Sequence, residues 1–225
     1  MRPLALLAAG LCVVALAGCA NSPAPNRYQQ LASSSQLAAA SSEGARRTPF
    51  SYEAPGTGLS RYRSVRLLPV SLYAGADHQF GTLSASDKAQ LAAFADEAFH
   101  AAFARAGLLA HGHADHAVEL KITLTGAQAN VPVLATATKL TPAGFALNGI
   151  NALAGNEGRF TGVVIYAVEF RDGASGKILW AFVTKQYPNA MNLAATLGPL
   201  DAAKAGLEEG AEALAKATAA RLKGV

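Results

Sequence analysis

Cysteine is almost absent from this chain of 225 residues. Its two cysteines, Cys12 and Cys19, both lie near the amino terminus. From residue 20 onward, the sequence therefore excludes a disulfide framework, thiolate metal ligands and a cysteine nucleophile. A stable fold in an oxidising compartment must come from its hydrophobic core alone.

Charged side chains are also scarce, at 15% of the residues, and the formal net charge is +4 at pH 7. The basic residues are dispersed along the chain, as in Arg61, Arg63 and Arg66, and form no long run. A nucleic-acid-binding domain usually concentrates its basic residues in one patch or stripe. This composition therefore disfavours a nucleic-acid partner.

The apolar run at the start of the chain, from Leu4 to Ala17, is too short to span a bilayer as a stable helix. One arginine precedes it and small residues follow it, as in a secretory signal peptide. The stretch ends in L-A-G-C, from Leu16 to Cys19, and resembles a bacterial lipobox. The sequence therefore predicts a signal peptide at 1–18 and a lipidated Cys19. The alternative is an uncleaved apolar segment with an incidental cysteine.

Lipidation of Cys19 would anchor the protein firmly. Each buried CH₂ contributes about 0.8 kcal/mol and a single acyl chain binds a membrane only marginally, whereas a lipobox cysteine carries three chains. The residue after Cys19 is Ala20 and not aspartate. By resemblance to Gram-negative lipoproteins, this favours the outer membrane, with the domain facing the periplasm.

The segment 19–47 is rich in Ser, Ala, Gln and Pro and has few aliphatic residues. This composition predicts a flexible tether, with a reach of roughly 30 Å at about 5–6 Å times the square root of the residue number. A short helix around 30–40 is the alternative. A single folded domain is predicted over 48–225.

Periodic apolar residues predict six elements in this domain. In chain order, they are a strand at 64–72, a helix from Ser84 toward Gly107, strands at 118–124, 162–170 and 178–184, and a closing helix from Leu200 to about Lys223. Pro69 predicts an edge or a bulge in the first strand, because proline cannot donate to a ladder. The strand at 118–124 alternates apolar residues with polar ones such as Glu119, so one sheet face should be covered and the other solvated.

This order of elements predicts an α+β fold. We expect a two-layer sandwich, in which two amphipathic helices cover one face of a mixed four-stranded sheet (β-α-β-β-β-α).

Several stretches carry a resemblance to a known family. "YRSVRLLPV", the long helix after it, "DHAVELKITLTGAQ", "GVVIYAVEFRDGASGKILWAF" and the Ala-rich closing helix are similar to a domain-of-unknown-function family of proteobacterial lipoproteins. The resemblance runs from about Phe50 to the end, and the hairpin loop matches at Asp172, Gly176 and Lys177. It implies a family and a periplasmic domain but no chemistry, because its motifs are strands and turns. The strand order also resembles, more loosely, small accessory lipoprotein domains of the envelope.

The stretch "HGHADH" places three histidines in one loop: His111, His113 and His116. With Asp115 they could supply the three or four ligands that zinc requires. The alternative, which we favour, is a solvated polar connection between a helix and a strand. Catalytic signatures are missing from the sequence: Ser175 lies in a strand-to-strand turn that lacks the G-x-S-x-G pattern. No phosphate-binding loop, dinucleotide fingerprint or zinc-protease motif occurs either. We therefore expect no catalytic residues and no cofactor.

The connection 131–159 is long, and long ordered connections often carry function. Phe145, Leu147 and Ile150 could form an exposed apolar lip that meets a partner or the membrane. The alternative is a short helix packed on the domain's own sheet.

Together these observations predict an outer-membrane-anchored periplasmic lipoprotein that acts as a non-enzymatic binding or accessory module. Its expected partners are the membrane, through the lipid anchor, and an envelope protein. The alternative is a periplasmic metal-binding protein that uses the histidine loop.

Overall fold

A computed structural model describes residues 22–40, 46–56, 58–111, 116–130, 162–188, 192, 195 and 197–224. The strands are β1 (Ala38–Ala39), β2 (Phe50–Glu53), β3 (Ser64–Leu67), β4 (Ser71–Leu72), β5 (Ala117–Gln128), β6 (Val163–Asp172) and β7 (Ile178–Gln186). The helices are the short 3-10 turn η3 (Leu59–Arg61), α2 (Ala85–Arg105) and α5 (Asp201–Lys223). In this part of the chain, no helix has both the length and the apolar character needed to cross a bilayer.

The sheet is larger than the sequence predicted. It has seven strands, in the order β1-β2-β7-β6-β5-β3, and β4 also pairs with β5. The four-stranded sheet is therefore wrong, although the α+β class holds. The predicted strand at 64–72 is two short strands, β3 and β4, which flank Pro69 and both run parallel to β5. The remaining two strands, β1 and β2, add an antiparallel edge beyond β7.

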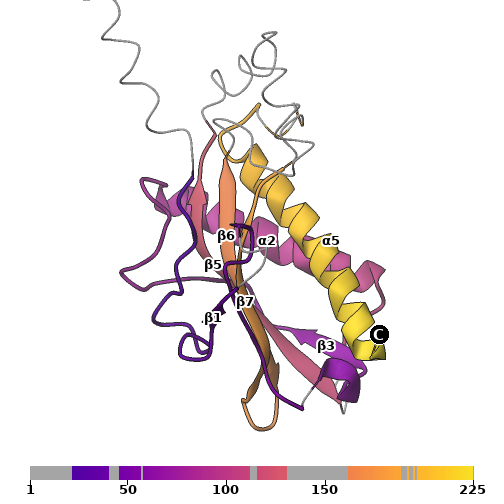
Figure 1. Cartoon of the computed structure of the whole chain (residues 1–225). Helices are drawn as coiled ribbons and strands as arrows, with labels where there is room; N and C mark the ends of the chain where they lie inside the picture. Colours follow the sequence, from indigo (N-terminus) through magenta and orange to yellow (C-terminus); the bar gives the residue numbers. More distant parts are fainter. Residues whose placement is uncertain are drawn as a thin grey trace, which may run out of the picture.

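The two predicted helices are confirmed, and they cover one face of the sheet (Figure 1). Helix α2 begins where expected: the Ser84 hydroxyl oxygen accepts the Asp87 backbone N–H at 3.0 Å. Its Oγ–H donates to the Asp87 carboxylate at 2.7 Å, so the cap is reciprocal. Such a cap satisfies one of the free N–H groups of the first turn. Gly107, just after the helix, has the positive φ of 66° that suits a helix end.

Helix α5 approaches the sheet closely at Gly210. A Cβ atom at this position would overlap the hydroxyl group of Tyr166, a fully buried residue of β6. Glycine is therefore required here for packing. Tyr166 in turn meets Phe99 of α2 edge to face at 5.5 Å, so the two helices share one core.

The opposite face of the sheet is not solvated as predicted, because the segment 22–40 packs on it (Figure 1). Tyr28 is 1% exposed, and its ring meets Tyr73 edge to face at 5.2 Å. Leu31 and Leu37 are also buried against this face. The flexible tether predicted over 19–47 is therefore wrong for residues 22–40, which form a third layer of the domain.

The N-terminal segment also covers polar groups of the sheet. Glu169 of β6 is 1% exposed, and its carboxylate accepts the Ser33 backbone N–H at 2.7 Å. On the neighbouring β5, Thr123 and Thr125 are buried, although alternation predicted that they would face water. A buried carboxylate is costly unless it is hydrogen-bonded. The segment therefore contributes hydrogen bonds as well as apolar contacts.

Candidate functional site

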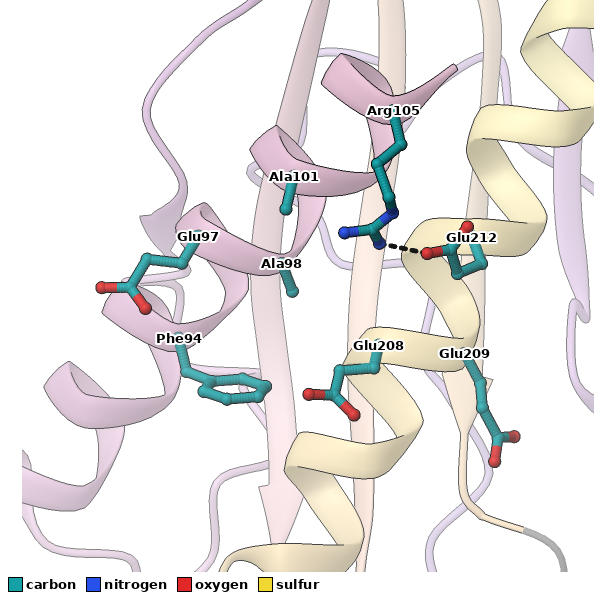
Figure 2. Close-up of a pocket in the computed structure, with 8 residues that line it drawn as sticks. All are labelled: Phe94, Glu97, Ala98, Ala101, Arg105, Glu208, Glu209 and Glu212. Carbon is teal, nitrogen blue, oxygen red and sulfur yellow. Dashed lines mark hydrogen bonds and ion pairs between the residues drawn. The ribbon is translucent and has the colours of Figure 1, made fainter.

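A groove of about 520 Å³ runs between α2 and α5, on the side of the helices away from the sheet. Its floor comes from α2, where Phe94, Ala98 and Ala101 follow one another at helical spacing. Figure 2 shows the Phe94 ring and the Glu208 carboxylate pointing toward the space between the two helices. Helix packing forms this groove, because the most buried residues of both helices point to the sheet and the flanking residues line the groove between the helices.

The rim of the groove is acidic. Glu97 lies on α2, and Glu208, Glu209 and Glu212 lie on α5. One basic residue, Arg105, lines the same groove and forms an ion pair with Glu212 across it (Figure 2). Both side chains of this pair are exposed, so it contributes little to stability. The groove therefore keeps an excess of negative charge over an apolar floor.

Burial dominates the environment of Glu209. Desolvation raises the pKa of its carboxyl, Arg47 lowers it, and the neighbouring Glu208 charge, the smallest of the three effects, raises it. A cation that bound here would favour the charged form of Glu209. The groove already makes one contact of this kind at its margin, since the Lys204 ammonium lies 5.5 Å from the centre of the Phe94 ring.

A second hollow, of about 410 Å³, lies at the β6–β7 hairpin. Arg61, Arg66 and His116 line it together with Tyr62 and Asp172. Its carboxylate is already satisfied: Asp172 accepts the Tyr62 hydroxyl at 2.7 Å on one oxygen and the Ser175 N–H and O–H groups on the other. Hydrogen bonds from Ser175 and Tyr62 lower the pKa of Asp172 to about 2. This arrangement fixes the hairpin.

A third hollow, of about 660 Å³, borders the start of the described chain. Pro23 lines it together with His78, Phe80 and Leu83. Gln79 ties this region together, because its side-chain amide donates to the Ala24 carbonyl at 2.9 Å and accepts the Asn26 N–H at 3.1 Å.

The structure places two of the three histidines of "HGHADH". His111 ends the range 58–111, and His116 has a positive φ of 70°, with its carbonyl accepting the Arg63 N–H at 3.0 Å. His113 lies outside the described residues. Within the described ranges, no three His, Cys, Asp or Glu side chains meet in a way that could hold a metal ion. The metal site therefore stays the alternative to the solvated loop that the sequence favours.

Other predicted residues also fall outside the described ranges. Cys19 is one, and Phe145, Leu147 and Ile150 of the long connection are the others. The two ends of that connection are held together: Asn130 accepts the Gly162 N–H at 2.6 Å and donates to the Gly198 carbonyl at 2.6 Å. A Cβ at Gly162 would lie 2.6 Å from the Gln128 carbonyl oxygen, so this junction leaves no room for a side chain.

The α2–α5 groove was not anticipated from the sequence. The helical stripe that includes Phe94 and Ala98 indicated an apolar helix face, but not where that face meets a second helix. The acidic residues between positions 208 and 212 mark the polar face of the closing helix, which lies beside its apolar stripe. We take this groove as the candidate site, since it combines a concave apolar surface with charge of one sign.

Comparisons with known proteins give a family but no activity. No curated protein matches the chain. Among solved structures, the PelC dodecamer from Paraburkholderia phytofirmans is 12% identical, and the match covers 77% of this chain and 94% of that chain at a TM-score of 0.37. A dodecamer of a PelC point variant from the same organism is also 12% identical, with 77% and 95% covered at a TM-score of 0.36. Scores this low support no conclusion about function or assembly.

The family model described as a protein of unknown function (DUF3313) matches residues 27–214. The match begins within the N-terminal segment that packs on the sheet, earlier than the resemblance from Phe50 suggested. It covers most of the 225 residues and bears out the expected uncharacterised family. The chain therefore belongs to the DUF3313 family of proteins of unknown function.

Proposed function

We propose that this protein is a lipid-anchored binding or accessory module of the cell envelope, held on the periplasmic face of the outer membrane and without enzymatic activity. The observation that carries the proposal is the L-A-G-C sequence ending at Cys19, which follows a basic start and a short apolar run. We further propose that the α2–α5 groove receives the partner, an envelope protein whose contact segment carries basic and apolar side chains.

The groove supports this choice of partner through its charge and its shape. Glu97, Glu208 and Glu209 line a groove whose floor is apolar, and Arg105 neutralises a fourth carboxylate, that of Glu212. A basic partner segment would be attracted by the rim and would bury an apolar side chain over Ala98 and Ala101. Complementary charge of this kind raises the association rate and selects the partner.

Lipidation is tested by cell fractionation of a Cys19→Ala variant. The matched control is Cys12→Ala, which removes the other cysteine and leaves L-A-G-C intact. We expect radiolabelled fatty acid and outer-membrane recovery for the wild type and for Cys12→Ala. The Cys19→Ala variant should stay uncleaved or be mislocalised. Unlabelled wild-type protein in the soluble periplasmic fraction would refute the proposal.

The groove is tested by photo-crosslinking in intact envelopes. A crosslinker at Ala101, in the groove, should capture one dominant envelope complex, and a crosslinker at Lys216, an exposed position farther along α5, should not. Glu208→Lys with Glu212→Lys should abolish capture at Ala101 while the fold is retained. Equal capture at both positions, or capture that survives the charge reversal, would exclude the groove as the binding site.

A further inference from the structure

The described chain begins bound to the domain, only three positions after the predicted lipid anchor. Ser22 is buried, and its hydroxyl accepts the Lys185 ammonium at 3.0 Å. Chain geometry allows at most about 3.6 Å per residue, so Ser22 lies within ~11 Å of Cys19. This is far shorter than the reach of roughly 30 Å that a free tether over the same segment would have.

One end of the sheet is therefore held near the anchor. Lys185 pairs with Ile165, one pair from the end of the β6–β7 ladder, close to where β7 ends and β6 begins. The N-terminal end of α5 lies at this same end (Figure 1). The contact of Asn130 with the Gly198 carbonyl, at 2.6 Å, ties the end of β5 to the residues just before α5. We call this the anchor end.

The anchor end carries an exposed apolar side chain. Leu197, which directly precedes Gly198, is 72% exposed, whereas Leu72, on the edge strand β4, is 39% exposed. These are the two large hydrophobic side chains that the described ranges leave exposed. An isolated exposed leucine needs no special explanation. It lies at the end of the sheet to which the predicted anchor would attach, so a membrane at that end would cover it.

Two basic residues, Arg47 and Lys185, lie at this end of the sheet. The Lys185 backbone N–H donates to the Arg47 carbonyl at 2.7 Å. The Arg47 guanidinium stacks on Tyr187 at 4.1 Å, and the Arg27 guanidinium lies 5.6 Å from the centre of the Phe50 ring. Glu209 offsets part of this charge, since Arg47 acts on its pKa.

We propose that the anchor end lies directly against the phosphate layer of the membrane, with Leu197 in the interface and Arg27, Arg47 and Lys185 close to anionic headgroups. This rests on the proposed lipidation of Cys19. Basic side chains near an anionic surface attract it within about one Debye length. The short link keeps Lys185, which bonds Ser22, about that close to the anchor. The β6–β7 hairpin then faces away from the membrane.

The test uses the processed protein, purified from membranes and reconstituted into vesicles that contain phosphatidylglycerol and a lipid with a nitroxide headgroup. A fluorophore is attached to Ala24→Cys at the anchor end or, in a second sample, to Ala174→Cys at the tip of the hairpin. We expect quenching at residue 24 and none at residue 174. Quenching at residue 24 should fall in Arg27→Gln/Arg47→Gln/Lys185→Gln and in Leu197→Ser.

Matched controls alter the same side chains elsewhere. Arg61→Gln/Arg63→Gln/Arg66→Gln and Leu72→Ser should leave the quenching at residue 24 unchanged. In 1 M salt, where the Debye length is about 3 Å, wild-type quenching should approach that of the Gln variant. Flotation with the vesicles is read in parallel. Protein that does not float refutes lipidation and this proposal with it. Protein that floats but is equally quenched, or equally unquenched, at both labels refutes the orientation alone.

Discussion

Replacing Tyr28 by alanine should destabilise the whole domain, because its side chain holds the N-terminal segment on the sheet. The ring is 1% exposed and packs on Tyr73, and the hydroxyl donates to the Gln79 side chain. Deleting a buried aromatic ring typically costs about 3–5 kcal/mol. Tyr28 also has a positive φ of 56°. Alanine would keep that backbone strain and lose the contacts that oppose it.

Two further variants separate the contributions. Tyr28→Phe keeps the ring and removes the hydroxyl, so it should cost about 0.5–1.5 kcal/mol, the usual net contribution of one hydrogen bond. Gln29→Ala is the matched control: the Gln29 side chain is exposed, and its backbone N–H still bonds the Asp77 carboxylate at 3.0 Å. A surface change of this kind should stay within about 0.5 kcal/mol.

The assay is urea unfolding at neutral pH. The change in unfolding free energy is taken from the shift of the unfolding midpoint, provided that the dependence on urea concentration has the same slope in each variant. If Tyr28→Ala and Gln29→Ala are equally stable, the segment does not pack on the sheet. The segment 19–47 would then be a flexible tether, and the short distance between Cys19 and the domain would no longer follow.

Three further predictions address packing, pH and metal. Gly210→Ala should destabilise the protein by about 1–3 kcal/mol through overlap with the Tyr166 hydroxyl. The loss of stability should be smaller in a Tyr166→Phe background, and Lys216→Ala, on the exposed face of the same helix, is the control that should change stability little. The pKa of Asp172 is lowered from 3.8 to about 2, so the stability that this carboxylate contributes is present above pH 4 and is lost as the pH falls toward 2. The unfolding free energies of wild type and Asp172→Asn should therefore differ at pH 7 and converge near pH 2. A difference that stays constant with pH would contradict the assignment. Zn²⁺ or Cu²⁺ added to chelator-treated protein should leave the melting temperature nearly unchanged. A real site, with free metal at 100 times its dissociation constant, would raise the free energy of unfolding by about 2.7 kcal/mol. A shift in melting temperature that vanishes in His111→Ala/His113→Ala/His116→Ala would instead favour the metal-binding alternative.

Local patterns predicted the helices and the three long strands. The Ser84 cap, the apolar stripe of α2 and the alternation along β5 each depend on neighbouring residues, so they can be recognised in sequence. The N-terminal layer could not be recognised in the same way. Tyr28, Leu31 and Leu37 are buried apolar residues within a polar segment. The average composition of the segment is polar, so it does not reveal that these three side chains are buried. Their burial depends on the sheet face that receives them.

The same limit applies to the candidate site. Phe94 and Ala98 read as part of a core stripe, and Glu208 and Glu212 read as a solvated face. The groove exists because α2 and α5 lie side by side, which is a tertiary contact that neither helix encodes alone. Short strands such as β1 and β2 were missed for a related reason, because strand formation depends on pairing with β7 more than on intrinsic preference.

Anchoring of this domain to a membrane through Cys19 can be measured from the mass of the amino-terminal tryptic peptide. Trypsin cleaves after Arg27, so the processed protein should yield the peptide 19–27. We expect its mass to exceed that of the sequence by one diacylglyceryl group and one further acyl chain, all on Cys19. A peptide 19–27 with a free thiol and a free amino group, or a mature protein that begins at another residue, would contradict it.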